Sequence, residues 1–364
     1  MMKKHRPIIL FLFRILLFSV PLWILLAVYV MLDPFMVVRS YDNYYERKGL
    51  HPTLDMDYVS CENYVRRNAT IHYNAFIMGN SRSQFWHISD WKKHLDDDAV
   101  ACHYYGNGET LYRLTRHLQF IHHLGGDIKY VILAIDQQLL EMVEPETTGH
   151  LGLMPPRVDG RLLSFHAENL LSFLKPEFLV GYLDYSIFGK HRSYMTEHFL
   201  FEQPVHYDPV TNEVQEFLAD EAIDNGTYYT PERIQRFENK QYPDSISPSV
   251  LKEEHIVLLQ QIKDIFKQHV TDYRIVINPL YDQIKLNPQD YRTLCHIFGQ
   301  KQVYDFSGPN SWNKDYHLYY EDSHYRPVVA NQMMDSIYRD NSRPYLVFAR
   351  RPITNISRRI GRIR

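Results

Sequence analysis

The chain has 364 residues, of which 45% are hydrophobic and 23% are charged, as is usual for a globular protein and not for a disordered one. Its formal net charge of −3 gives no electrostatic reason to expect a nucleic-acid partner. Three cysteines, Cys61, Cys102 and Cys295, lack the spacings of zinc or redox sites and allow at most one disulfide.

The N-terminal residues combine a basic segment at 3–6 with an apolar run over residues 8–32. A helix rises about 1.5 Å per residue, so this run is long enough for a bilayer core of about 30 Å. Arg14 interrupts the run but can snorkel to the membrane surface. The run is longer than the apolar region of a cleavable signal peptide and does not end in small residues. We expect residues 1–34 to be a retained anchor with a cytoplasmic N-terminus.

No second apolar run is long enough to cross a membrane. We therefore expect residues 35–72 to connect the anchor to the body and to pack on it, and residues 73–340 to form one extracytoplasmic body, in the periplasm or at the cell surface. Residues 341–364 form a basic tail, which suits contact with anionic lipid or polysaccharide, or a solvated disordered end.

Apolar runs and helical patterns alternate along the body. The expected strands cover residues 75–78, 99–105, 130–135, 274–278 and 302–306, and the expected helices cover 110–124, 250–269 and 327–338. This order predicts an α/β fold, a three-layer parallel sheet with helices on both faces. Residues 145–245 break the alternation. We expect them to be an insertion over the carboxyl edge of the sheet, where such folds bind ligands, or a surface elaboration without function.

The first expected strand ends at Gly79, and Ser81 follows two residues later. A tight turn at this place exposes a serine Oγ and directs backbone N–H groups the same way, which are the two requirements of a serine nucleophile. The segment also fits an ordinary strand-to-helix turn in which the serine caps a helix. Arg82 can bind an anionic group of a substrate or pair with a local acid.

A polar turn with two carboxylates and a histidine, Glu321, Asp322 and His324, lies just before Pro327. Proline is favoured in the first turn of a helix. A carboxylate two or three residues before the histidine can hold the imidazole in the tautomer that a general base needs. The alternative is a helix cap with an exposed histidine.

Taken in chain order, these blocks resemble the SGNH hydrolase family, also called the GDSL-type esterases. In that family a Gly-Asp-Ser-like block follows the first strand, as residues 79–81 do here, and Asp-x-x-His precedes the last helix. Glu321 stands in the place of that aspartate, and Asp322 is within reach if the turn is tighter. The resemblance spans residues 73–338 outside the insertion and implies a flavodoxin-like fold. It is closest to the membrane-anchored branch with a Gly-x-Ser-Arg-Ser block, which is associated with acyl groups on cell-envelope polysaccharides.

The resemblance also implies the groups that bind the oxyanion. The family uses the serine amide, a glycine after the second strand, which is Gly106 here, and an asparagine after the third strand. This chain has Asp136 at the third place, and an ionised aspartate cannot donate a hydrogen bond. Either Asn107 substitutes or the oxyanion hole is weaker, and the loss of one donor typically costs about 10²–10³ in rate. No metal or organic cofactor is expected.

Other polar residues are weaker candidates. Asp55 and Asp57 are similar to the acidic pair of a metal-dependent glycosyltransferase, but no nucleotide-binding pattern surrounds them, and we expect a solvated turn. Asn278 and Asp282 follow a strand at the carboxyl edge of the sheet, where either a substrate contact or a turn is expected.

The expected function is a membrane-anchored extracytoplasmic serine esterase or O-acyltransferase that acts on acyl esters of a cell-envelope or exported polysaccharide. The expected partners are the lipid bilayer through residues 8–32, a glycan or acylated small-molecule substrate, and a membrane protein that supplies the acyl donor. The alternative is a catalytically inactive member that binds polysaccharide or assists assembly of an export complex.

Overall fold

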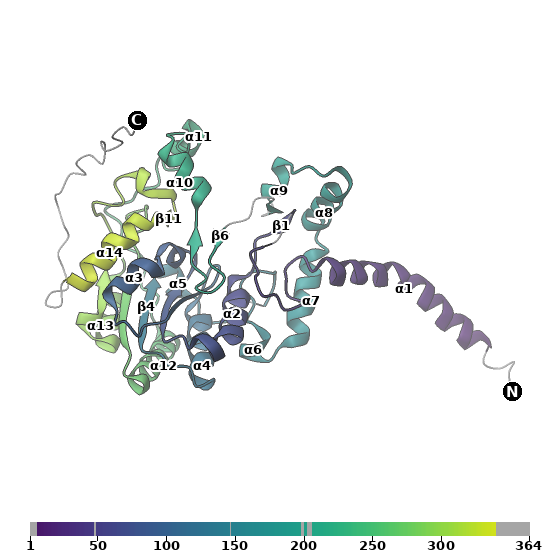
Figure 1. Ribbon diagram of the computed structural model, residues 1–364, viewed down its shortest axis with the longest axis horizontal. Helices are drawn as coiled ribbons and strands as arrows, with labels where there is room; N and C mark the ends of the chain where they lie inside the picture. The colour runs from purple at the N-terminus through teal and green to yellow at the C-terminus, as the bar shows by residue number, and fades with distance from the viewer. Residues whose placement is uncertain (1–5, 47–48, 146, 198–199, 202–205, 340–364) are drawn as a thin grey trace, which may run out of the picture.

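The computed structural model describes residues 6–46, 49–145, 147–197, 200–201 and 206–339 of the chain (Figure 1). The first five residues and the predicted basic tail at 341–364 lie outside the described residues. A long apolar helix projects from a body in which a sheet is surrounded by helices (Figure 1).

The body contains a five-stranded parallel sheet, which confirms the predicted α/β class. In spatial order its strands are β3 (Ala101–Tyr105), β2 (Ala75–Gly79), β4 (Tyr130–Ile135), β8 (Asp272–Ile277) and β9 (Val303–Asp305). Gly79 at the end of β2 is in register with Tyr105 of β3 and Ala134 of β4. The residues that follow these three strands therefore meet at one edge of the sheet.

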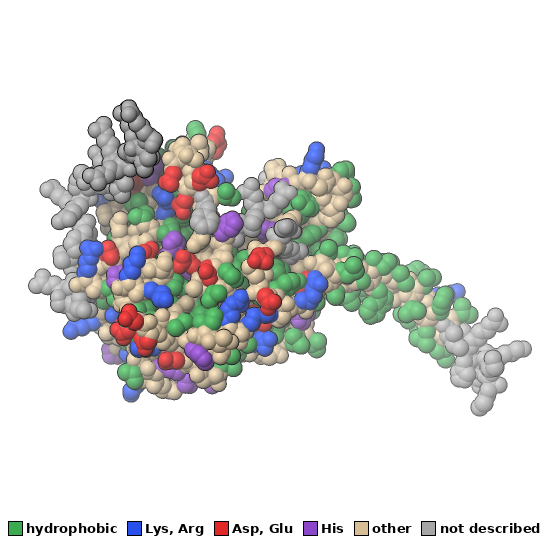
Figure 2. Space-filling view, viewed as in Figure 1, with side chains coloured by type: hydrophobic (Ala, Val, Ile, Leu, Met, Phe, Trp, Pro, Cys, Tyr) green, Lys and Arg blue, Asp and Glu red, His purple; other side chains and the backbone are tan. Residues whose placement is uncertain are grey.

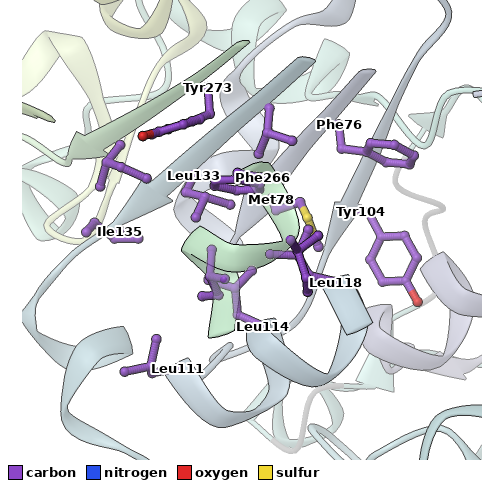
Figure 3. Close-up of a cluster of buried hydrophobic side chains, with 14 of the residues drawn as sticks. Phe76, Met78, Tyr104, Leu111, Leu114, Leu118, Leu133, Ile135, Phe266 and Tyr273 are labelled. Atoms are coloured by element: carbon purple, nitrogen blue, oxygen red, sulfur yellow. The ribbon is translucent and has the colours of Figure 1, made fainter. Parts of the chain in front are cut away.

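Helices cover both faces of this sheet because successive strand residues point to opposite sides. Phe76 and Met78 of β2 face α4 (Leu111–His123) and α12 (Glu253–His269), together with α13 (Pro288–Phe298) (Figure 3). Ala75 and Ile77 face the other way, toward α3 (Ile88–Trp91) and α14 (Pro327–Arg339). The alternation explains why β2 is apolar throughout.

The N-terminal helix α1 (Arg6–Leu32) has 27 residues, and its segment Leu10–Leu32 is long and apolar enough to cross a membrane. It is the one such helix in the described part of the chain. Asp33 ends it: this buried carboxylate accepts hydrogen bonds from the backbone N–H groups of Val37 and Arg39, at 2.8 and 3.0 Å. The turn fixes the direction in which the chain enters the body.

The segment after α1 packs on the body through a third apolar cluster, to which it contributes Phe35, Tyr44 and Leu50. It contributes β1 (His51–Pro52) and α2 (Met56–Ile71), and α2 contacts β3. The cluster joins this segment to the first half of the predicted insertion, whose elements are α6 (Pro156–Asp159), α7 (Leu162–Phe173), α8 (Pro176–Phe188), α9 (Ser193–Glu197) and β5 (Leu200–Phe201). The first half of the insertion therefore shares an apolar core with the segment that follows α1.

The second half of the insertion lies beside the C-terminal elements. It contains β6 (His206–Tyr207), β7 (Val214–Gln215), α10 (Phe217–Asp224) and α11 (Pro231–Gln235). Tyr228 and Tyr229 donate hydrogen bonds to the backbone oxygens of Tyr320 and Tyr319, at 3.0 and 2.8 Å. The other short elements are η2 (Ser81–Phe85), η3 (Lys92–His94), α5 (Gln137–Glu141), η4 (Gln300–Gln302), η5 (Tyr316–Leu318), β10 (Tyr319–Glu321) and β11 (His324–Tyr325).

All three cysteines lie within the described residues and are free thiols. Cys61 and Cys102 are buried, and burial raises the pKa of Cys61 to about 12 and the pKa of Cys102 further. Because the thiolate is the reactive form, neither is suited to act as a nucleophile.

Leu118 and Leu124, at the middle and the end of α4, allow a matched test of the core. Leu118 is fully buried against the sheet, whereas Leu124 is 54% exposed. We expect Leu118→Ala to lower the free energy of unfolding by about 2–5 kcal/mol because it leaves a cavity. Leu124→Ala should change it by less than about 0.5 kcal/mol. Urea unfolding of the full chain in detergent measures both, and equal effects would contradict this placement of α4.

Candidate active site

Ser81 lies in a turn that the end of β2 makes possible. A Cβ at Gly79 would lie 2.3 Å from the backbone oxygen of Ala134, so only glycine allows β2 and β4 to approach at this point. Asn80 caps η2, and its side-chain oxygen accepts from the backbone N–H of Arg82 at 3.1 Å. Since Asn80 is the cap, the hydroxyl of Ser81 is available for another partner.

That partner is His324, whose Nε2 lies 2.8 Å from Ser81 Oγ although the two residues are 243 positions apart in the chain. His324 is on β11, which forms a hairpin with β10 through a two-residue turn. Sequence analysis expected only a polar turn here. The hairpin sets the histidine against the carboxyl edge of the sheet.

The hairpin places the two predicted acids differently. Glu321 is directly opposite His324 in the antiparallel register, so both side chains lie on one face. Glu321 Oε1 is hydrogen-bonded to His324 Nδ1. Asp322 lies in the turn instead, and its carboxylate is 3.5 Å from the Nζ of Lys240. The structure therefore brings together Ser81, His324 and Glu321, whereas Asp322 pairs with Lys240.

Glu321 is held in its ionised form. Burial alone would raise its pKa, but the hydrogen bond and charge of His324, with further hydrogen bonds from Ser323, lower the pKa of Glu321 to about 2. The pKa of Asp322 moves the other way, because burial and the neighbouring Glu321 disfavour a second charge. Glu321 is thus the carboxylate that can stabilise an imidazolium at neutral pH.

Asp136 takes no part as a hydrogen-bond donor. It is 2% exposed, and its carboxylate accepts from the backbone N–H of Leu139 at 3.0 Å, from Asn80 Nδ2 at 2.7 Å and from Arg82 Nη1 at 2.8 Å. Of the two roles that the sequence left open for Arg82, the structure shows the local ion pair. Asp136 therefore fixes the turn that carries Ser81.

Arg82 connects this turn to the histidine hairpin. Besides its pair with Asp136, its Nε donates to the backbone oxygen of Ser323 at 3.1 Å, next to His324 in the chain. One guanidinium thus joins the serine turn, the end of β4 and the hairpin, so we assign it a positioning role.

Of the other two predicted oxyanion groups, the Gly106 amide already faces an acceptor, whereas Asn107 uses only its side-chain oxygen. The Gly106 amide lies 3.3 Å from the backbone oxygen of Gly79, and Asn107 Oδ1 accepts from the backbone N–H of Met56 at 2.8 Å. The side-chain nitrogen of Asn107 and the backbone N–H of Ser81 have no hydrogen-bond acceptor among the described residues. These two groups are the donors that remain for an oxyanion.

The loop of Gly106 and Asn107 rests on a buried charged cluster. The prediction of a solvated turn at Asp55 and Asp57 is wrong, because both are 3% exposed or less. Asp57 binds Arg113 Nη1 at 3.0 Å and His117 Nε2 at 2.9 Å, and a Cβ on Gly106 would lie 2.3 Å from its carboxylate. The carboxylate of Asp57 is thus paired with Arg113 and His117 of α4.

The same cluster has donors for a metal ion, since Asp57, Glu109 and His117 each offer an atom within 4.8 Å of the others. The guanidinium of Arg113, however, pairs with both carboxylates, at 3.0 Å from Asp57 and 3.3 Å from Glu109. Since a cationic group already lies between the acids, we assign the cluster a structural role beneath the loop.

Sequence analysis missed two residues near the imidazole. The ring of Phe85 lies edge-on to the ring of His324, with centroids 5.5 Å apart. Glu216, from the second half of the insertion, has its pKa raised by burial and by Asp220, while the nearby His324 lowers it. Phe85 follows Ser81 in η2, but the sequence carries no signal for Glu216.

Asn278 and Asp282 differ in their surroundings. Asn278 Oδ1 accepts from Tyr325 Oη at 2.9 Å, and Trp86 Nε1 donates to the same hydroxyl at 2.7 Å, so Asn278 supports the hairpin. Burial raises the pKa of Asp282, and the charge of Arg82 opposes that rise. Asp282 is therefore near the site without touching the serine or the histidine.

Comparison with known proteins does not place the chain in a family. It matches no protein-family model and no curated protein. Functional assignment therefore depends on the geometry of the site itself.

Glu321→Gln should alter how stability depends on pH. The pKa of Glu321 is lowered on folding from 4.5 to about 2, so its ionisation stabilises the fold above pH 4.5, and this contribution is lost as the pH falls toward 2. We expect the difference in unfolding free energy between the wild type and Glu321→Gln to shrink over that window. Urea titrations at several pH values measure it, with the exposed Glu238→Gln as control. A difference independent of pH would contradict the ion pair.

Proposed function

We propose that this chain is a membrane-anchored serine esterase or O-acyltransferase of the SGNH type. One observation supports the proposal above the others: Ser81 Oγ is 2.8 Å from His324 Nε2, and the opposite ring nitrogen faces an ionised Glu321. This is the arrangement in which a serine hydroxyl becomes a nucleophile.

In the proposed reaction, Ser81 Oγ attacks the carbonyl carbon of an acyl ester while His324 Nε2 takes its proton. Glu321 orients the imidazole and stabilises the imidazolium. The oxyanion is bound by the Ser81 amide and the side-chain nitrogen of Asn107. His324 then protonates the leaving alcohol, which releases it and leaves an acyl-serine. Water or an acceptor hydroxyl, deprotonated by the same histidine, takes the acyl group and restores the serine.

The proposed location follows from the N-terminal segment. A helix of 27 residues is about 40 Å long, more than enough to span a bilayer. With the basic end of the chain in the cytoplasm, the body with Ser81 lies outside it, in the periplasm or at the cell surface. An exported or cell-envelope glycan is then the proposed acceptor or ester substrate, and a membrane protein the proposed source of the acyl group.

A second function, polysaccharide binding without catalysis, is favoured by the state of the oxyanion groups. Asp136 is a charged acceptor, and the Gly106 amide already faces the backbone oxygen of Gly79. An enzyme with these two donors missing would be slow. Serine reactivity distinguishes the two functions.

Ser81 should be the residue that reacts with a fluorophosphonate probe. We expect the full chain to be labelled, and Ser81→Ala to abolish the labelling because it removes the hydroxyl that faces His324 Nε2. Ser89→Ala, an exposed serine on the following helix, is the matched control and should retain full labelling. If the wild type stays unlabelled, or if Ser81→Ala is still labelled, the chain does not act through this serine.

The two acids of the hairpin should differ in their effect on rate. Glu321→Gln removes the charge that fixes the tautomer of His324, and in a comparable triad the aspartate-to-asparagine change lowers kcat by about 10⁴. Asp322→Asn changes a neighbouring residue that contacts Lys240, and we expect less than a tenfold change. Rates of p-nitrophenyl acetate hydrolysis or of probe labelling give the comparison. A larger loss for Asp322→Asn would assign the role to that residue instead.

A further inference from the structure

Two helices of the insertion present large apolar side chains to solvent. On α7, Leu163 is 87% exposed and Leu171 is 56% exposed; on α8, Leu183 is 54%, Ile187 is 70% and Phe188 is 60% exposed. Single exposed leucines are common, but a contiguous exposed apolar surface marks a contact site.

On each helix, two of these side chains lie on one face. Leu163 and Leu171 are eight residues apart, which is two steps of four along α7, and Leu183 and Ile187 are four apart along α8. The opposite faces are buried in the third apolar cluster, through Phe165 and Phe173 of α7 and Phe178 and Tyr182 of α8. Both helices are therefore apolar on the side that the body covers and on a side that it does not.

The anchor helix packs on the covered side of α7. Near the end of α1, the ring of Tyr29 packs on Phe173 of α7 with centroids 5.6 Å apart, and α1 contacts α7. In Figure 1, α7 runs across the direction of α1, and α7 and α8 lie on the side of the body from which α1 leaves. Figure 2 shows hydrophobic side chains extending from α1 onto that edge of the body.

Exposed basic residues flank the two apolar faces. Arg161 precedes α7, Lys175 lies between the helices, and Lys190 follows α8. Helices that lie in a membrane surface have this composition, with the apolar face among acyl chains and basic side chains at the level of the lipid phosphates.

We propose that α7 and α8 lie in the interfacial layer of the same bilayer that α1 spans, with their exposed apolar faces among the lipid chains. The position of α7 and α8 beside the apolar helix α1 favours lipid over a second copy of the chain or another protein. The inference rests on the proposed membrane anchor. It assigns the first half of the insertion to the membrane, and it fixes the body against the bilayer instead of leaving it free on a tether.

Site-directed spin labels in the full chain test this placement. Cys295, the one cysteine that is not buried, is replaced by alanine, and single cysteines are introduced as Leu163→Cys on α7 and Ile187→Cys on α8. Leu17→Cys in α1 is the positive control, and Val257→Cys, 51% exposed on α12, is the matched control on the body. Each protein is placed in nanodiscs of mixed zwitterionic and anionic lipid. Collisions with oxygen, which concentrates in lipid, are compared with collisions with a water-soluble nickel chelate.

We expect the labels at 163 and 187 to be accessible to oxygen and shielded from nickel, as the label at 17 is, and the label at 257 to show the reverse. If the labels at 163 and 187 behave like the label at 257 while the label at 17 is in lipid, the result supports the membrane anchor and overturns the interfacial placement of α7 and α8. Shielding of 163 and 187 from both reagents indicates protein contact and also overturns it. If the label at 17 is itself accessible to nickel, the membrane anchor fails first.

Discussion

The ion pair between Arg82 and Asp136 is the contact on which the candidate site depends. Its two side chains are 13% and 2% exposed, so the pair is largely removed from water. Breaking such a pair by removing one partner typically costs about 3–5 kcal/mol, because the other charge stays buried. The same carboxylate receives Asn80, and the same guanidinium reaches the backbone at Ser323. The turn that carries Ser81 and the hairpin that carries His324 are thus held together by the ion pair of Arg82 and Asp136.

This pair also explains why an aspartate stands at position 136, where the SGNH resemblance would place an asparagine. An asparagine at 136 could donate to an oxyanion, but it could not balance the buried charge of Arg82. Asp136 instead orients the turn that carries Ser81, by accepting hydrogen bonds from Arg82 and Asn80. A site organised in this way has a well-placed serine and histidine and few oxyanion donors. Both the proposed acyl transfer and its non-catalytic alternative follow from that combination.

The sheet could be predicted from the sequence because its central strands β2 and β4 are continuous apolar runs, and the run at 130–135 coincides with β4. The β10–β11 hairpin could not, since strands of three and two residues are too short to show a period. The burial of Asp57 was also hidden, because its partners Arg113 and His117 are 56 and 60 residues away. The local sequence pattern identified Ser81, His324 and Glu321 as candidates. The distance between Ser81 and His324 could not be predicted, because it depends on contacts between residues far apart in the chain.

The hairpin separates two kinds of contact within the site. Glu321 and His324 are three residues apart, so their pairing closes a very short loop, whereas Ser81 meets His324 across 243 residues. Long-range contacts of this kind form late, because the chain entropy of closing the loop must be overcome first. The acid and base can therefore assemble as a local unit during folding, whereas the serine reaches them only once β2 and the hairpin have come together. Reactivity at Ser81 would consequently report that these two distant parts of the chain have met.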